Sequence, residues 1–488
     1  MRIKQWFRSC RRIPHAALLG GICAALCLTL LACGQKKQPA AKIDPDLARA
    51  IAEKKAMAKE LAATATNPVP GEVWTFFDLA ERNDLHGATN EFERLQEKFT
   101  RYYHTPPPKG LWASVRDALL GISRPATLLG TSPPATALND ALWCPVHESV
   151  GMVECFNEWD NQLLHQFGND VINSIPTNSI YFGGTDPGRF VITALSESYR
   201  RGKPFFTITQ NALADGRYLD YLRWMYGATI YIPTATDSQD AFSNYLSDAQ
   251  QRLQLGKLKP GEDVKMVNGR VQVSGQVAVM AINGLLVKTI FDRNPNHDFY
   301  IEESFPLEWM YSYLLPHGLI LKLNPEPLTE LDESVCRKDH DFWRRYTAQF
   351  IGDWLTDETP VSQVCGFSDR IFLKKDFTGF TGNRAFIENA EAQKAFSKLR
   401  SSIGGLYAWR RDHAGSEAKE RMATEADYAF RQALALCPYS PEAVFRYVNL
   451  LLATGRAHDA LLVAQTCQRL DPNNSQVNDL LEQLKKSQ

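Results

Sequence analysis

The stretch that decides the fold of the central region is Ser179-Ile-Tyr-Phe-Gly-Gly-Thr-Asp-Pro-Gly-Arg-Phe190. It begins with a short apolar run, which is typical of a buried strand, and continues directly into two glycines. Asp186 suits a helix N-cap, and Pro187 suits the first helical position. The stretch therefore predicts a strand, a tight turn and a helix, which together are the first half of a βαβ unit.

The following segments extend this alternation of strands and helices. Strands are predicted at 179–182, 205–209 and 229–232, with helices at 187–201 and 217–226 between them. Asn268-Gly269 separates two apolar runs and predicts a hairpin. Beyond it we expect a helix at 276–293, a strand at 298–301, a helix at 307–315 and a strand at 319–323. The alternation predicts an α/β fold with a mostly parallel, Rossmann-like sheet and flanking helices.

The C-terminal part carries a repeat. Pro438 and Pro472 are 34 residues apart, which is the period of tetratricopeptide repeats. Gly455 lies at the expected turn between two helices, and Ala460 and Ala464 are small enough for close helix packing. The predicted domain order is a signal peptide or signal anchor at 1–33, a tether with N-terminal helices at 34–104, a connector wrapping the next domain at 105–174, the α/β domain at 175–330, a linking segment at 331–389 and a tetratricopeptide-repeat region at 390–488. The N-terminal helices are expected at 44–65 and, as a helical hairpin that turns near Asn83-Asp84, at 74–103. The connector should contain one short helix near 112–120.

The N-terminus has the pattern of an export signal. Basic residues at 2, 4, 8, 11 and 12 precede an uncharged, mostly apolar run at 16–33. Its end, Leu30-Leu-Ala-Cys-Gly34, resembles the lipobox of bacterial lipoproteins and implies that Cys33 carries a lipid. An uncleaved signal anchor and a soluble secreted form are the alternatives. The positive-inside bias places the folded body on the extracytoplasmic side of a bacterial envelope membrane.

Composition limits the classes of partner and cofactor. The net charge of −1 excludes a global basic field, so we expect no nucleic-acid partner. No CxxC spacing occurs, and we expect neither a metal nor a cofactor. Cleavage before Cys33 leaves six cysteines besides Cys33 in an oxidising compartment. The pairs to test are Cys144 with Cys155 and Cys336 with Cys365; buried free thiols are the alternative.

The candidate ligand site lies at the carboxyl ends of the predicted strands, where open α/β sheets bind their ligands. A glycine-rich turn at a helix start suits phosphate or carboxylate, although Asp186 would repel an anion. The alternative is a tight turn without a ligand. Only one of two adjacent glutamates on a strand would line a site. The candidate residues are Gly183, Gly184, Thr185, Asp186, Gly188, Arg189, Asn211, Asp215, Glu302 and Glu303.

Catalytic motifs are incomplete. His147-Glu148 does not extend to HExxH, and no GxSxG occurs. A Cys155–His165 pair is disfavoured by the acidic and aromatic residues around Cys155. We therefore assign no catalytic residues and favour a binding protein over an enzyme.

Two resemblances bear on function. The segments 175–190, 210–215 and 300–311 resemble a group of uncharacterised bacterial tetratricopeptide-repeat lipoproteins. The order of Gly184, Asp186, Asn211 and Gly318-Leu319 also resembles the soluble C-terminal region of protein O-mannosyltransferase-like membrane glycosyltransferases. The catalytic carboxylates of those enzymes belong to a membrane-embedded part that has no counterpart here, so this resemblance implies a detached accessory domain.

These observations predict a membrane-anchored, extracytoplasmic protein that binds a ligand or a partner. The α/β part would hold a glycan or a phosphate-bearing ligand, and the repeats would dock a protein. The alternatives are an enzyme or accessory subunit acting in envelope glycan or glycosyl transfer, and a structural scaffold.

Overall fold

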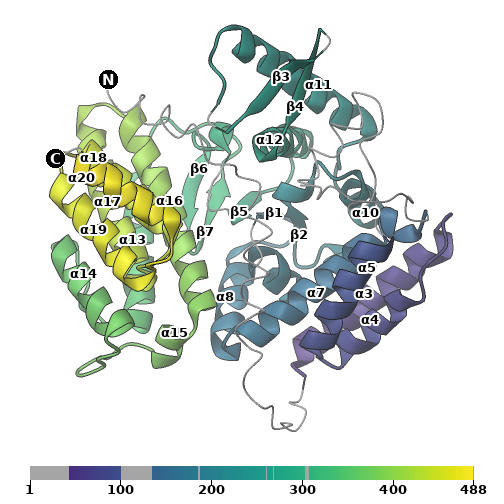
Figure 1. The fold of residues 1–488 in the computed structure, drawn as a ribbon, viewed down its shortest axis with the longest axis horizontal. Helices are drawn as coiled ribbons and strands as arrows, with labels where there is room; N and C mark the ends of the chain where they lie inside the picture. Colours follow the sequence, from purple (N-terminus) through teal and green to yellow (C-terminus); the bar gives the residue numbers. More distant parts are fainter. Residues whose placement is uncertain are drawn as a thin grey trace. The chain divides into compact units, whose positions relative to one another are not determined.

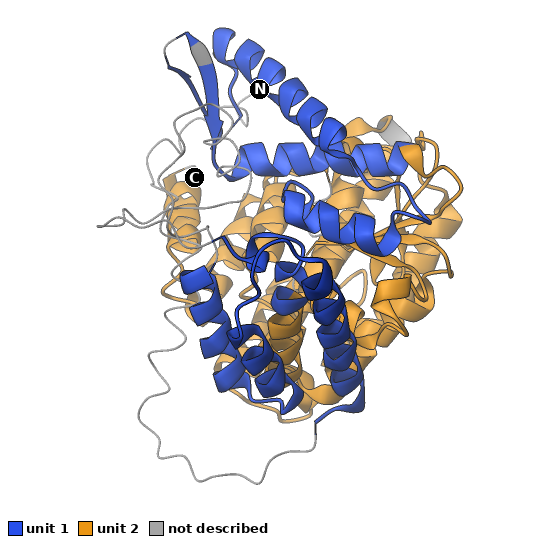
Figure 2. Ribbon diagram, turned by 90° about the vertical axis from the view of Figure 1, so that its right-hand side faces the viewer, with its two compact units in different colours: residues 1–147, 211–292 blue, residues 148–210, 293–488 orange. Residues whose placement is uncertain are grey.

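The computed structural model describes residues 43–99, 135–184, 187–259, 261–267, 269–302 and 307–486. The chain forms two compact units, each built from two segments (Figures 1 and 2). Unit 1 contains 1–147 and 211–292, and unit 2 contains 148–210 and 293–488. The predicted anchor with Cys33 and the short helix expected near 112–120 lie outside the described residues. Among the described helices, none is long and apolar enough to span a membrane.

Unit 1 begins with three helices that the sequence predicted. Asp44 caps the first helix, because its Oδ1 accepts the backbone N–H groups of Asp46 at 2.9 Å and Leu47 at 3.4 Å. Asn83, in the left-handed region with φ of 54°, makes the turn after the second helix. The elements are α3 (Pro45–Thr64), α4 (Glu72–Glu81), α5 (Leu85–Phe99) and the 3₁₀ turn η2 (Ala137–Asn139).

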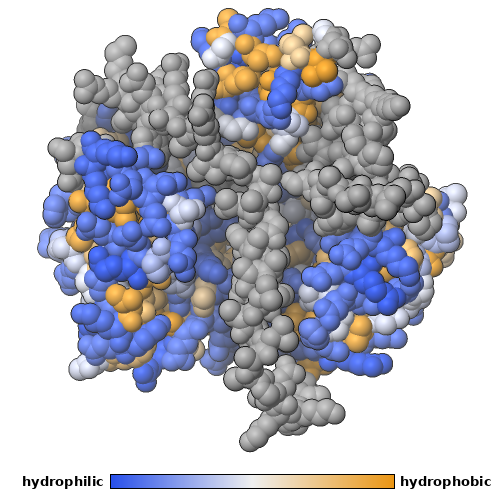
Figure 3. Space-filling view, in the orientation of Figure 1, coloured by the Kyte–Doolittle hydropathy of each residue, from blue (hydrophilic) through white to orange (hydrophobic). Residues whose placement is uncertain are grey.

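The second segment of unit 1 contains the predicted hairpin. Gly269 has a φ of 74°, as the two-residue turn requires. Met266 and Val267 are exposed near this turn, and apolar surface gathers over the hairpin in Figure 3. The elements are η5 (Gln210–Ala212), α10 (Gly216–Tyr226), α11 (Ala235–Gln254), β3 (Asp263–Val267), β4 (Arg270–Ser274) and α12 (Gln276–Arg293). The first residue of η5 and the last residue of α12 belong to unit 2.

The strand predicted at 229–232 is wrong. The backbone N–H groups of Thr229 and Ile230 both bond to the carbonyl of Tyr226, so the chain is still turning after α10. Ile230 and Ile232 are buried without pairing to a strand. These residues are apolar because they pack in the core. A short apolar run has the same sequence pattern whether it forms a strand or an irregular buried segment.

The sheet of unit 2 is mixed. Its strands are β1 (Ile180–Gly183), β2 (Phe206–Thr209), β5 (Phe299–Glu302), β6 (Leu314–His317) and β7 (Ile320–Leu323), in the order β2-β1-β5-β7-β6. Strand β1 is parallel to both β2 and β5, whereas β7 is antiparallel to β5 and β6. The α/β class is therefore confirmed, but among the described strands the parallel part of the sheet contains only β1, β2 and β5.

Strand β6 occupies part of the region where a helix was predicted at 307–315. Gly318, with a φ of 60°, turns the chain so that β6 and β7 form a hairpin on the edge of the sheet. Burial alternates along β6, which is the period of a strand. Only the 3₁₀ turn η6 (Glu308–Met310) is helical in that region.

The helix predicted at 187–201 is interrupted. It is replaced by the π turn η3 (Pro187–Val191), the short helix α9 (Ile192–Leu195) and the 3₁₀ turn η4 (Tyr199–Arg201). The hydroxyl of Ser196 donates to the carbonyl of Ile192 at 2.7 Å, and Ser198 bridges to Lys203. These contacts turn the chain back toward β2 after one helical turn.

The remaining elements of unit 2 are helical. They are α8 (Asn161–Ser174), α13 (Glu333–Ile351), α14 (Val361–Ser368), η7 (Asp369–Leu373), α15 (Arg384–Glu388), α16 (Ala390–His413), α17 (Ser416–Leu436), α18 (Pro441–Ala453), α19 (Ala457–Leu470) and α20 (Ser475–Lys486). Helix α7 (Trp143–Glu158) passes from unit 1 into unit 2. From α16 onward each helix packs on the next, with Ala460 and Ala464 fully buried.

A charged pair lies in the core of these helices. The Asp339 side chain on α13 and the Arg400 side chain on α16 are 1% and 0% exposed, and Oδ2 lies 2.7 Å from Nη1. The Tyr407 hydroxyl donates to the same carboxylate oxygen at 2.9 Å, and Arg400 Nε donates to Gln432 Oε1 at 2.7 Å. Burial raises the pKa of Asp339, and Arg400 opposes that rise. The network joins α13, α16 and α17.

The six described cysteines are buried free thiols, so neither tested pairing is present among them. Cys144 and Cys155 lie eleven residues apart on α7, which corresponds to about 16 Å along a helix. A disulfide cannot bridge that separation. Burial raises the pKa of Cys336 to about 12 and that of Cys365 to about 11, which keeps both thiols protonated at neutral pH.

Candidate functional site

The carboxyl ends of β1, β2 and β5 form one edge of the sheet in unit 2. Gly183 is in register with Thr209 on one side and with Glu302 on the other. The backbone N–H of Gly184 donates to the carbonyl of Glu302 at 3.1 Å. The structure thus brings together residues that the sequence predicted for the site from two distant segments. We call this place the β1–β5 edge.

The glycines at this edge allow close backbone packing. A Cβ added to Gly183 would lie 2.7 Å from the carbonyl oxygen of Gly188, and one added to Gly188 would overlap the carboxylate of Glu302. The Tyr181 hydroxyl donates to the Gly188 carbonyl at 2.9 Å and holds η3 against the strands. The glycines therefore have a structural role, whether or not a ligand binds.

The predicted anion site at a helix start is not supported. The segment that begins at Pro187 forms a five-residue π turn, which is followed by a four-residue α-helix. So short a helix lacks the row of aligned peptide dipoles on which anion binding depends. The neighbouring Glu302, which is 2% exposed, brings a carboxyl group to the same place, and a carboxylate would repel an anion.

Three further polar side chains lie around η3. Arg189 is 9% exposed, and its Nη2 is 3.7 Å from Oε1 of the fully buried Glu148 on α7. The Tyr199 hydroxyl donates to the same Glu148 oxygen at 2.9 Å. The buried groups near η3 therefore include two carboxylates and one guanidinium. Sequence reasoning considered Glu148 only as part of a metalloprotease motif, although an acidic residue within the apolar α7 was a signal for a buried partner.

Gln210 follows β2 at the same edge. It is 0% exposed, and neither its amide nitrogen nor its amide oxygen has a hydrogen-bond partner among the described residues. Buried amides are nearly always paired. Gln210 therefore has one donor group and one acceptor available for a bound polar group or an ordered water.

The remaining predicted residues are either in unit 1 or outside the described residues. Asn211 and Asp215 lie in unit 1, where both have local structural roles. The Asn211 carbonyl accepts Nδ2 of Asn283 at 2.9 Å. Asp215 caps α10 through the backbone N–H of Arg217 at 2.9 Å and pairs with that arginine's Nη2 at 2.7 Å. Thr185, Asp186 and Glu303 lie outside the described residues.

Comparison with known proteins does not place the chain in a family. No protein-family model matches it, and no curated protein or solved structure does so. The functional argument therefore rests on the geometry of this chain.

Proposed function

We propose that this protein is a membrane-anchored, extracytoplasmic binding protein, and that the β1–β5 edge binds a hydroxyl-bearing ligand such as a glycan. The topology of the three parallel strands carries the proposal. The chain leaves β1 for β2 on one side, and β5 joins β1 on the other side. In an open α/β sheet such a reversal opens a crevice beyond the carboxyl ends of the strands. This arrangement supports a Rossmann-like interpretation of the parallel part.

The side chains near that position favour sugar hydroxyls over phosphate. Glu302 is buried at the end of β5, and Glu148 lies beside Arg189. A carboxylate accepts hydroxyl donors but repels a phosphate. The Gln210 amide adds a donor and an acceptor, which suits a group that both donates and accepts. Of the two ligand types expected from the sequence, a glycan fits these groups better.

The test uses Glu302→Gln, which keeps the shape of the side chain and removes its charge. Binding of mannobiose, chitobiose and a muramyl disaccharide is measured by calorimetry. We expect at least one of them to bind the unaltered protein, and Glu302→Gln to weaken that binding about tenfold or more, because charged hydrogen bonds contribute about 1.5–3 kcal/mol. Glu308→Gln, at an exposed position, is the matched control.

Binding of none of the three sugars, or equal binding by Glu302→Gln, contradicts the proposal. A Glu302→Gln variant that binds normally but loses a sugar transfer or hydrolysis activity supports the enzymatic alternative. The observation that favours this alternative is the presence of two buried carboxylates, Glu302 and Glu148, because paired carboxylates can serve as acid and base.

We further propose that the C-terminal helices are tetratricopeptide repeats that dock a protein partner. Helices α18 and α19 occupy the 34-residue unit, and Gly455, with a φ of 77°, turns the chain between them. The buried Ala460 and Ala464 let the helices approach closely. Stacked helix pairs of this kind create extended surfaces for other proteins.

The anchor proposal predicts a lipidated N-terminus. Mass spectrometry of the protein purified from membranes should show a chain that begins at Cys33 with its thiol acylated. Cys33→Ser should keep the whole signal segment, because the thiol that accepts the lipid is missing. A mature protein that retains Met1 contradicts the lipoprotein proposal and leaves the uncleaved anchor.

A further inference from the structure

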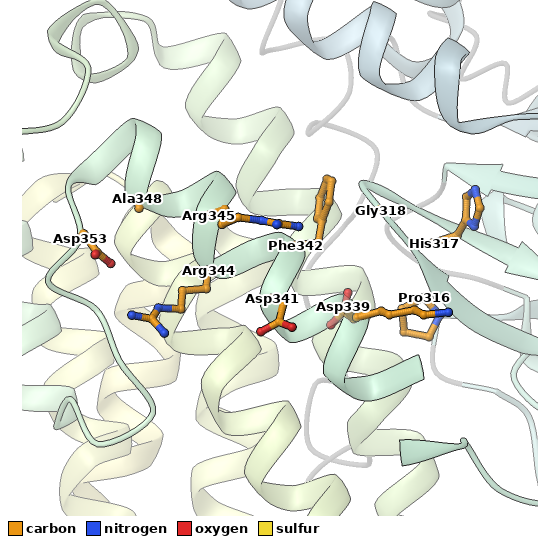
Figure 4. Close-up of a pocket in the computed structure, with 11 residues that line it drawn as sticks. Pro316, His317, Gly318, Asp339, Asp341, Phe342, Arg344, Arg345, Ala348 and Asp353 are labelled. Carbon is orange, nitrogen blue, oxygen red and sulfur yellow. The ribbon is translucent and has the colours of Figure 1, made fainter. Parts of the chain in front are cut away.

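A groove runs along α13 in unit 2, and none of its lining residues belongs to the β1–β5 edge. Its volume is about 650 Å³, and it lies between one face of α13 and the turn that joins β6 to β7 (Figure 4). Lys338, Phe342 and Arg345 stand on successive turns of that face. Known small-molecule sites have volumes of about 300–1,000 Å³, so the groove is large enough for one.

The groove has free positive charges. Lys338, Arg344 and Arg345 are exposed, and none of them forms an ion pair with any described residue. Two exposed acids, Asp341 and Asp353, also line the groove and have no ion pair within the described part of the chain. The third acid, Asp339, is neutralised by Arg400 at 2.7 Å. Three cations against two free acids leave the groove with a net positive charge.

An aromatic face lies next to one of these cations. The Phe342 ring is half-buried and stacks on Tyr346 with ring centroids 5.2 Å apart and an interplanar angle of 22°. In Figure 4 the side chain of Arg345 extends toward Phe342, which stands beside Gly318. Because the stacking fixes the ring, Phe342 offers a flat apolar surface beside a guanidinium.

We infer that this groove binds a small anion attached to an aromatic or other flat apolar group. The apolar group stacks on Phe342, and the carboxylate or phosphate pairs with Arg345. Lys338 lies seven residues earlier, so it reaches the ligand from about 10 Å along the helix axis. The groove is independent of the glycan proposal, because the two sites share no residue.

The probes are phenyl phosphate, benzoate, inorganic phosphate and benzylamine, titrated into the full chain and followed by calorimetry. We expect the unaltered protein to bind phenyl phosphate or benzoate at least fivefold more tightly than benzylamine. Arg345→Ala should weaken binding of the preferred anion about tenfold, and Lys338→Ala about threefold. Asp341→Asn should strengthen it about threefold, because it removes a repelling charge.

The aromatic contribution has its own variant. Phe342→Ala should lower the affinity for phenyl phosphate to that for inorganic phosphate. Arg337→Ala is the matched control: Arg337 is exposed on the same helix, pairs with Glu333, and does not line the groove. The substituted charges are on the surface, and equal melting temperatures verify that the variants fold.

Comparison of benzoate with phenyl phosphate identifies which anion the groove prefers, and either preference supports the inference. Benzylamine binding as tightly as both anions overturns it. So does unchanged anion binding by Arg345→Ala and Lys338→Ala.

Discussion

Arg400→Met is expected to destabilise unit 2 by about 3–5 kcal/mol, because it leaves the buried carboxylate of Asp339 without its countercharge. The Arg400 guanidinium is 2.7 Å from Asp339 Oδ2, and both side chains are at most 1% exposed. It also donates to Gln432 and stacks over Trp343 at 5.2 Å from the ring centroid. Urea denaturation followed by tryptophan fluorescence, with calorimetric melting of the same samples, measures the loss.

The control and the rescue separate charge from packing. Lys394→Met, on the exposed side of the same helix, should change stability by about 0.5 kcal/mol or less. Adding Asp339→Leu to Arg400→Met should recover much of the loss, because paired apolar groups can replace a buried ion pair. A loss below about 1 kcal/mol in Arg400→Met would show that Asp339 is satisfied without the arginine.

The sequence predicted helices around Arg400, in the repeat region, but only a linking segment around Asp339, and it did not predict that the two residues meet. Asp339 and Arg400 are 61 residues apart, and neither belongs to a motif. Helical periodicity identifies the apolar face of each helix, yet it does not show which charged residue on one helix meets which on another. That pairing depends on how α13, α16 and α17 pack, which is a tertiary property.

The short apolar segments show the same limit at the level of secondary structure. The run at 229–232 was predicted as a strand and is irregular, with Ile230 and Ile232 buried, whereas the end of the helix predicted at 307–315 is the start of β6. Four apolar residues suit a strand, a turn or a helix end equally well. Long periodic segments, such as α3 and α12, were predicted within one residue or two of their observed ends.

At the candidate site, the sequence identified residues through a topological rule. Gly183 and Glu302 are 119 residues apart, but both end parallel strands, and such ends meet at one edge. The rule did not reveal what the glycines contact. Gly188 was interpreted as part of an anion-binding turn, whereas its missing side chain makes room for a carboxylate. The rule concerns the ends of strands, so it could not identify Glu148, which lies on a helix before the sheet.

Gly188→Ala tests that interpretation and should destabilise unit 2 by about 1–3 kcal/mol through overpacking. The added methyl group would overlap the carboxylate of Glu302, and Glu302 is 2% exposed, so its side chain would have to move within a buried site. The backbone of Gly188 does not require a positive φ, so alanine brings no conformational strain of its own. Gly216→Ala is the matched control, because no atom lies within 4 Å of the added Cβ there.

A double-mutant cycle identifies the group responsible. If Glu302 is the obstacle, Gly188→Ala should cost less by about 1 kcal/mol or more in a Glu302→Ala background, because the cavity left by the glutamate accepts the methyl group. Additive effects would locate the obstacle elsewhere along η3, for example where Gly188 meets Gly183. Equal stability of Gly188→Ala and Gly216→Ala would mean that η3 moves away from the strands at little cost. In that case the close contact between η3 and β5 would not define the shape of the β1–β5 edge.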